Sequence, residues 1–216
     1  MPPTDAATAN PSGPTVGLIA REPNGTRARP FASVGLRVTV FDSGVAADAP
    51  PPPATDPLRH DWLPPPGVEV TADLGRLGEP DTLLVCVPTA LTSARGADTT
   101  ALAAVARAIS RRLRAGQLVV LTSPAPPGTA RAVVLPLLAA TGLVPGRDFF
   151  LACAVPQAEH AALVVGGWDG ASARAAAALY TRAGFVVSCV SSLEAAEVCG
   201  TIGGRSARFG RRWRTS

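Results

Sequence analysis

Residues 82–87 read Thr-Leu-Leu-Val-Cys-Val, residues 117–121 read Gln-Leu-Val-Val-Leu, and residues 99–113 between them place apolar side chains at helical spacing. Short, fully apolar strands that alternate with an amphipathic helix are typical of a parallel sheet covered by helices on both faces. In such sheets, ligands bind beyond the carboxyl ends of the strands. Here these ends carry Pro88-Thr89 and Thr122-Ser123. Residues 81–129 therefore predict both a fold and the edge at which it would bind a ligand.

The same alternation extends over most of the chain. Further strands are predicted at residues 15–20, 36–41, 68–71, 149–154, 163–166 and 185–190, and further helices at residues 26–34, 73–77, 129–140, 171–182 and 192–200. This pattern predicts one α/β domain over residues 15–202, with a doubly wound, mostly parallel, Rossmann-like sheet. We expect residues 1–14 to be disordered, the Pro-rich residues 46–66 to form an extended loop, and residues 203–216 to be a basic, disordered tail.

Composition excludes several classes of protein. The net charge of +4 comes from five arginines in the last twelve residues, and without them 15 arginines face 16 acidic residues, so a nucleic-acid partner is not expected. No run of 18 apolar residues and no signal-peptide pattern is present, so we expect a cytoplasmic chain with no membrane partner. The four cysteines lack metal-site spacing, and His60 and His160 are isolated, which predicts no metal centre. All 20 basic residues are arginine.

The turn after the first predicted strand resembles a dinucleotide-binding motif only in part. Such a motif has three glycines and, about 20 residues later, an acidic residue for the ribose hydroxyls. Here residues 20–25 read Ala-Arg-Glu-Pro-Asn-Gly, and Asp42 ends the second strand. Glu22 brings a negative charge to the place of a pyrophosphate, and Pro23 removes an N–H donor. These residues leave open whether a dinucleotide still binds. A P-loop needs a lysine and a serine-hydrolase elbow needs Gly-x-Ser-x-Gly, and neither is present.

A set of segments, in order along the chain, resembles the UDP-glucose/GDP-mannose dehydrogenase family. They are residues 82–89, 114–123, 126–129 (Pro-Pro-Gly-Thr), 147–152, 164–167, 178–180 and 191–197. The likeness extends over residues 15–201 and covers the family's amino-terminal NAD-binding domain. The family oxidises the 6-hydroxymethyl group of a nucleotide sugar in two NAD-dependent steps, with a cysteine, a lysine and a glutamate, in polysaccharide biosynthesis.

The resemblance implies that NAD is the cofactor and that Asp42 holds its adenosine ribose. Thr89 would line the cleft, and Thr122 and Ser123 would lie near the nicotinamide. The expected cofactor-binding residues are Ala20, Gly25, Asp42, Val87, Pro88, Thr89, Thr122 and Ser123. Thr89 and Ser123 also fit a purely structural role as helix caps.

The same alignment shows departures from the family. The family's second threonine after the strand falls on Pro124, its lysine on Gly200, and its glutamate-bearing loop on residues 154–157, which read Ala-Val-Pro-Gln. The cysteine belongs to a later region, so Cys199 is not that nucleophile. Without these groups the chemistry cannot run. We therefore expect no catalytic residue here and predict a truncated NAD-binding domain, inactive by itself, with weak or lost NAD binding.

Two alternatives remain open. The chain could supply the cofactor half of an oxidoreductase that another polypeptide completes, and only then would a nucleotide sugar bind. It could also be a non-catalytic binding or regulatory module that has lost NAD binding. The sequence does not decide the oligomeric state.

Overall fold

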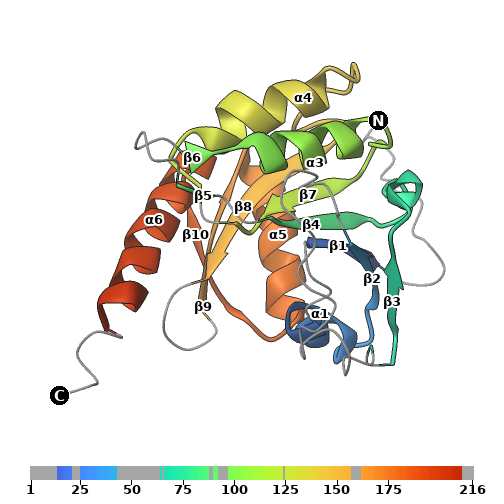
Figure 1. Ribbon diagram of the computed structural model, residues 1–216, viewed down its shortest axis with the longest axis horizontal. Helices are drawn as coiled ribbons and strands as arrows, with labels where there is room; N and C mark the ends of the chain where they lie inside the picture. Colours follow the sequence, from blue (N-terminus) through green and yellow to red (C-terminus); the bar gives the residue numbers. More distant parts are fainter. Residues whose placement is uncertain are drawn as a thin grey trace, which may run out of the picture.

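The fold is built on one eight-stranded sheet (Figure 1). A computed structural model describes residues 14–20, 25–42, 64, 66–87, 90–91, 97–123, 125–156 and 162–210, without the side chains of 25, 26, 90, 91, 97 and 202–210. The strands are β1 (Thr15–Ala20), β2 (Arg37–Asp42), β3 (Val68–Thr71), β4 (Thr82–Cys86), β7 (Leu118–Leu121), β8 (Phe150–Pro156), β9 (Ala162–Gly167) and β10 (Val186–Val190). Their order is β10-β9-β8-β7-β4-β1-β2-β3, and only β8 and β9 pair antiparallel. This is the doubly wound, mostly parallel, Rossmann-like sheet that the sequence predicts.

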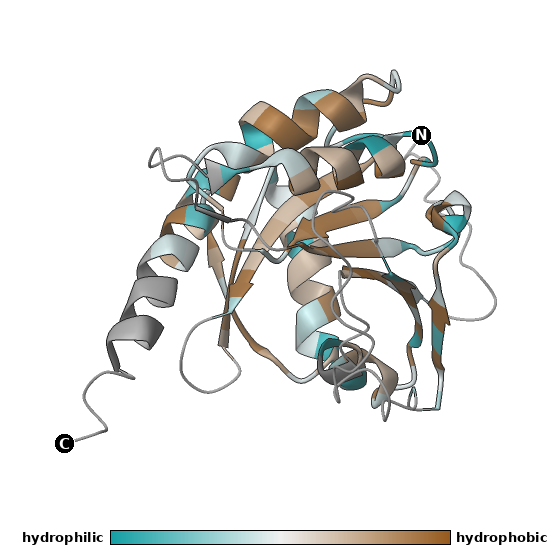
Figure 2. Cartoon of the chain, in the orientation of Figure 1, coloured by the Kyte–Doolittle hydropathy of each residue, from teal (hydrophilic) through white to brown (hydrophobic). Residues whose placement is uncertain are grey.

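Helices cover both faces of the sheet (Figure 1). One core contains buried residues of α3 (Thr100–Ser110), of η2 (Ala130–Val134), which continues into α4 (Leu135–Ala139), and of α6 (Leu193–Gly210). The other core contains residues of α1 (Gly25–Ala32) and α5 (Gly170–Arg182), with Phe31 and Tyr180 in edge-to-face contact at 5.7 Å. The central strands β4 and β7 are almost wholly buried, so their sequences are continuously apolar (Figure 2).

The glycines of the segment Val164-Val165-Gly166-Gly167 permit two helices to approach β9 closely. A Cβ on Gly166 would lie 2.0 Å from the backbone oxygen of Ser192, at the start of α6. A Cβ on Gly167 would lie 2.4 Å from the backbone nitrogen of Ala173 in α5. The backbones of both helices therefore rest directly on the strand, which requires residues without side chains at these two positions.

The predicted elements are all present, with three corrections. The helix predicted to end at Gly200 continues to Gly210, so its last ten residues were wrongly assigned to a non-helical ending. The helix predicted over residues 129–140 consists of a π-helical turn followed by a short α-helix, because Pro136 has no N–H to donate and must lie near a helix start. The short antiparallel pair β5 (Ala90–Leu91) and β6 (Ala97–Asp98) was not predicted.

Some predictions concern residues that are not described. Residues 1–13, the loop residues 46–63 and residues 211–216 lie outside the described part of the chain. Within the part that is described, no helix is long and apolar enough to cross a bilayer. In the same part, no three potential metal ligands lie together.

Candidate functional site

The chain reverses its direction across the sheet between β1 and β4, and this creates the candidate site. From β1 it proceeds outward to β2 and β3, then returns to the other side of β1 as β4. The parallel register sets Ala20, the last residue of β1, opposite Asp42 of β2 and Cys86 of β4. Where successive connections leave in opposite directions, a crevice opens beyond the strand ends. Three of the chain's strand-end residues therefore meet at one edge.

Asp42 has the properties expected of a ligand for a hydroxyl pair. Its side chain is half-buried, and no hydrogen bond to its carboxylate occurs within the described residues. An ionised carboxylate accepts hydrogen bonds through both oxygens, which matches the two hydroxyls of a ribose. Asp42 therefore stays a candidate ligand at the carboxyl end of β2. Residues 21–24, which include Glu22 and Pro23, lie outside the described residues, and of Gly25 only the backbone is described, as the first residue of α1.

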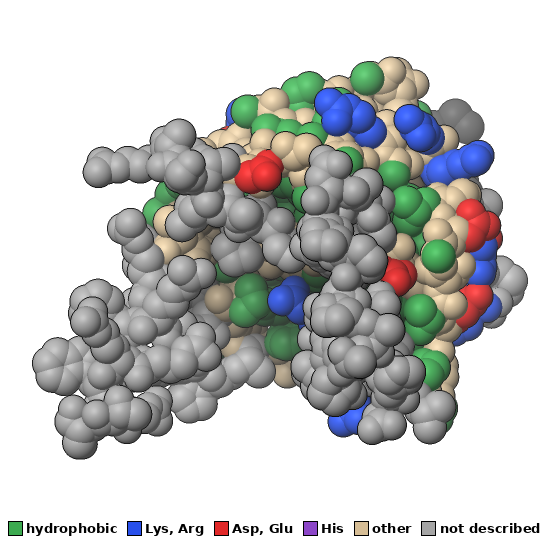
Figure 3. Space-filling model, viewed as in Figure 1, with side chains coloured by type: hydrophobic (Ala, Val, Ile, Leu, Met, Phe, Trp, Pro, Cys, Tyr) green, Lys and Arg blue, Asp and Glu red, His purple; other side chains and the backbone are tan. Residues whose placement is uncertain are grey.

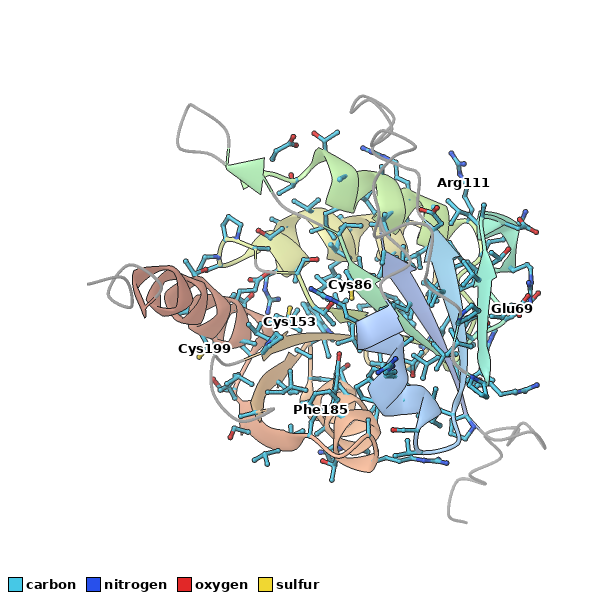
Figure 4. All side chains as sticks on the ribbon, turned by 60° about the horizontal axis from the view of Figure 1, so that its bottom comes forward. Glu69, Cys86, Arg111, Cys153, Phe185 and Cys199 are labelled. Carbon is cyan, nitrogen blue, oxygen red and sulfur yellow. The ribbon has the colours of Figure 1, made fainter. Side chains whose placement is uncertain are left out.

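Cys86 and Thr122 meet on the other side of the crevice. The Thr122 hydroxyl donates to the carbonyl of Val85 at 3.0 Å, so it accepts from the Cys86 thiol, whose Sγ lies 2.6 Å from Oγ1. The Ser123 hydroxyl also lies 3.5 Å from the same carbonyl. Thr122 and Val87 are buried, and Cys86 is half-buried near the middle of the molecule (Figure 4). Both hydroxyls predicted at the nicotinamide end are thus turned toward the sheet. Pro88, Thr89 and Pro124 lie outside the described residues.

Sequence reasoning missed the role of Glu197. This side chain of α6 is buried and accepts hydrogen bonds from the backbone N–H groups of Gly128, at 2.5 Å, and Ala130, at 2.8 Å. Burial raises the pKa of its carboxyl, and the two N–H groups counteract this only in part. Gly128 belongs to the Pro-Pro-Gly-Thr segment 126–129, Ala130 follows it directly, and Glu197 ends the segment 191–197. Their 67 to 69 residues of separation conceal the contact.

The position of Gly200 has no space for a side chain. A Cβ there would lie 2.7 Å from Cγ1 and 3.2 Å from Cγ2 of Val155, on β8. Valine has two heavy atoms on Cβ and few χ1 rotamers, so it cannot easily give way. The carboxyl end of β8 therefore lies directly against the backbone of α6.

A hollow of about 460 Å³ at the opposite edge of the sheet does not belong to this site. It is lined by the amino ends of β1, β2 and β3, with Arg76, Glu69 and Glu79 in its wall. Arg76 pairs with both glutamates, at 2.5 Å and 2.9 Å. Acidic and basic side chains lie together on the side of the molecule where β3 runs (Figure 3). Because charged groups that satisfy one another attract a ligand weakly, and because parallel sheets bind at their carboxyl edge, we assign the site to the crevice.

A doubly wound sheet with an acidic residue at the end of its second strand is typical of dinucleotide-binding domains. Residues 67–183, more than half of the chain, match the family model described as "UDP-glucose/GDP-mannose dehydrogenase family, NAD binding domain". The chain belongs to this family and contains its NAD-binding domain. No curated protein sequence matches it.

Solved structures of dehydrogenases have the same fold. The chain is 22% identical to UDP-D-ManNAc dehydrogenase from Pyrococcus horikoshii, with a TM-score of 0.72. The matched region covers 90% of this chain and 50% of the other. It is 25% identical to NDP-N-acetyl-D-galactosaminuronic acid dehydrogenase from Methanosarcina mazei, with a TM-score of 0.71. This match covers 90% of the present chain and 47% of the other. For GDP-mannose dehydrogenase from Pseudomonas aeruginosa the identity is 18%, the TM-score 0.71, and the coverage 90% and 50%. The chain thus spans about half the length of these structures.

Proposed function

We propose that this chain binds NAD in the crevice beyond β1 and β4 and does not by itself oxidise a nucleotide sugar. The observation that carries the first half is the register that sets Asp42 beside Ala20, with the carboxylate half-buried and without a hydrogen bond in the described part of the chain. Asp42 would hold the adenosine ribose, and Ala20 would let the cofactor approach the backbone. NAD, when bound, supplies a hydride acceptor. Val87, Pro88, Thr89, Thr122 and Ser123 would border it toward the nicotinamide.

The second half rests on the groups that the reaction requires. The chain has no lysine, and the position corresponding to the family's lysine is Gly200. That position is closed by Val155, so the absent side chain has left no space behind. The loop that would supply a glutamate reads Ala-Val-Pro-Gln. We propose that any oxidation would need these groups from another polypeptide, and that a nucleotide sugar binds only in their presence.

A second candidate function is a non-catalytic binding or regulatory module that has lost NAD. It is favoured by Glu22 and Pro23, which oppose a pyrophosphate at the turn after β1. It is also favoured by Thr122, whose hydroxyl already serves the Val85 carbonyl and the Cys86 thiol. NAD affinity decides between the two candidates.

The deciding experiment is calorimetric titration of the purified chain and of Asp42→Ala with NAD. We expect wild-type binding in the micromolar to low millimolar range. Loss of a charged acceptor for the ribose should weaken it by about tenfold or more. Glu79→Ala is a matched control, because it removes the same charge at the opposite edge of the sheet. Equal affinities in all three proteins would exclude the assigned site, and no wild-type binding at millimolar NAD would favour the non-catalytic module.

A further inference from the structure

Glu197 connects α6 to the turn that leaves the crevice. The turn begins after Thr122 and Ser123, at the carboxyl end of β7, and reaches the helical residues at Ala130. The first N–H groups of a helix have no partner within the helix and carry partial positive charge. Glu197 takes two such groups at this end, those of Gly128 and Ala130. The carboxylate of Glu197, from α6, thus accepts hydrogen bonds from N–H groups of the turn and balances their partial positive charge.

The turn depends on α6 for its outer contacts. Hydrogen bonds between Thr129 and Pro126 close the turn. The backbone N–H and the hydroxyl of Thr129 both donate to the carbonyl of Pro126, at 3.1 Å and 2.6 Å. Further contacts come from α6, where the Thr201 hydroxyl donates to the carbonyl of Glu197 at 3.0 Å and its Oγ1 lies 3.5 Å from the carbonyl oxygen of Ala125. Glu197 therefore ties the turn to α6 by two hydrogen bonds, in addition to the burial of Ala130 in the core.

The surroundings of Glu197 make its charge state consequential. Burial raises the pKa of the Glu197 carboxyl, and the negative charge of Glu194 adds to this. Glu194 itself pairs with Arg131, and the hydrogen bond from Arg131 lowers the pKa of Glu194 to about 2. On β8, burial raises the pKa of the Cys153 thiol, and the charge of Glu197 raises it further, so the thiol stays neutral. The pKa of Glu197 is thus raised, whereas that of its neighbour Glu194 is lowered.

Protonation would remove part of the contact. An ionised carboxylate accepts from both N–H groups, whereas a protonated one has a hydroxyl that must donate. One of the two N–H groups would then face another donor in a buried place, which costs free energy. The turn would then keep only one of its two hydrogen bonds to Glu197. The residues before the turn, Thr122 and Ser123, would be held less firmly in place.

We propose that Glu197 is a positioning residue whose ionised carboxylate fixes the turn 125–130 and, through it, Thr122 and Ser123 in the cofactor crevice, so that NAD affinity falls when Glu197 is protonated. This inference rests on the proposed NAD site and adds to it a control by pH. Glu197 touches neither cofactor nor substrate in this account. It acts only through the turn.

The first test follows the carboxylate without any cofactor. In the wild-type chain, the amide proton signals of Gly128 and Ala130 should shift together as Glu197 titrates, because a hydrogen bond to a carboxylate changes when the carboxylate is protonated. In Glu197→Gln these shifts should disappear, while Glu194→Gln, a neutralised neighbour on the same helix, should retain them. Amide exchange at Thr122 should accelerate at least tenfold in Glu197→Gln. Unchanged exchange at Thr122 would overturn the inference even where the two amide signals titrate.

The second test measures NAD affinity between pH 4.5 and 8. The wild-type dissociation constant should rise about tenfold as pH falls through the transition seen in the amide signals. The Glu197→Gln constant should be raised throughout and lack this transition. Identical pH profiles in the two proteins would overturn the inference. If the wild-type chain binds no NAD, the proposed function fails, and the exchange at Thr122 still decides whether Glu197 fixes the turn. Should Glu197→Gln not fold, the wild-type titration and Glu197→Asp, whose shorter side chain cannot reach both N–H groups, provide the same comparison.

Discussion

At the scale of single residues, Val155 fills the space beside Gly200 that a side chain there would need. Glycine within a helix is about 1 kcal/mol less favourable than alanine, so an interior glycine in α6 needs a reason. The reason is the 2.7 Å that would separate an added Cβ from Cγ1 of Val155. A long polar side chain at position 200 and a valine at position 155 therefore exclude each other.

A double-mutant cycle measures this exclusion. We expect Gly200→Ala to destabilise the chain by about 1–2 kcal/mol, because the overpacking exceeds the gain in helix propensity. In a Val155→Ala background the same change should instead stabilise it, which gives a coupling of about 1–3 kcal/mol between two touching residues. Denaturant unfolding of the four proteins provides the values. Additive effects would show that Val155 does not fill this space.

What the sequence revealed at the residue scale depended on separation along the chain. The position of Asp42 at the end of β2 was predictable, because the end of a strand and an acidic residue there are both local features. The bond from Glu197 to Gly128 was not predictable, since it joins two elements 69 residues apart that only the packing of α6 brings together. The same holds for Gly200, because the residue that excludes a side chain there, Val155, lies on β8.

At the scale of elements, β1, β4 and the segment before β7 are joined at their amino ends by Asp81. Its carboxylate accepts from the backbone N–H and the hydroxyl of Thr15, both at 3.0 Å, and from Arg114 at 2.7 Å. Partial burial would raise the pKa of the Asp81 carboxyl, but the hydrogen bonds from Arg114 and Thr15 together outweigh it and lower the pKa. Asp81 is thus the common partner of elements that the sheet order makes neighbours.

This junction predicts a pH dependence of stability. Because the folded pKa of Asp81 is lowered, its contribution is present above the pKa of the unfolded chain and is lost as pH falls through the folded pKa. Asp81→Asn should therefore reduce stability by about 1 kcal/mol at pH 7 and by less at pH 3, because pH 3 lies below the ordinary aspartate pKa of the unfolded chain and part of the contribution is already lost there. Unfolding by urea at the two pH values tests this. Asp42→Asn is the control, because it makes the same change at a carboxylate that accepts no hydrogen bond within the described residues. An equal loss at both pH values would contradict the prediction.

Elements were predicted well where one local signal dominates. The buried strands β4 and β7 are apolar throughout, so length and composition suffice to identify them. Pro136 correctly indicated that the helix after β7 is interrupted. Periodicity, however, cannot distinguish a π-helical turn from an α-helical one. The strands β5 and β6 have two residues each and carry no periodic pattern at all.

At the scale of the whole molecule, the two edges of the sheet differ in how they are protected. The β3 edge carries the charged group of Arg76, Glu69 and Glu79. The β10 edge carries no charge, since residues 184–193 contain neither acidic nor basic side chains, and Val186 is 65% exposed. Edge strands offer unpaired backbone groups to other chains, and charged side chains are a common protection against such pairing. The β10 edge is therefore the part of the described surface most prone to association.

This difference predicts concentration-dependent self-association through β10. Val186→Lys should reduce it, because a charge that must be desolvated opposes pairing of two edges. Light scattering over a range of concentrations should show a lower average mass for this variant than for the wild type. Val144→Lys is a matched control, since Val144 is 41% exposed and lies in a loop, away from both sheet edges. A monodisperse monomeric wild type, or the same reduction in both variants, would contradict the prediction, because the cause would then be absent or would be net charge alone.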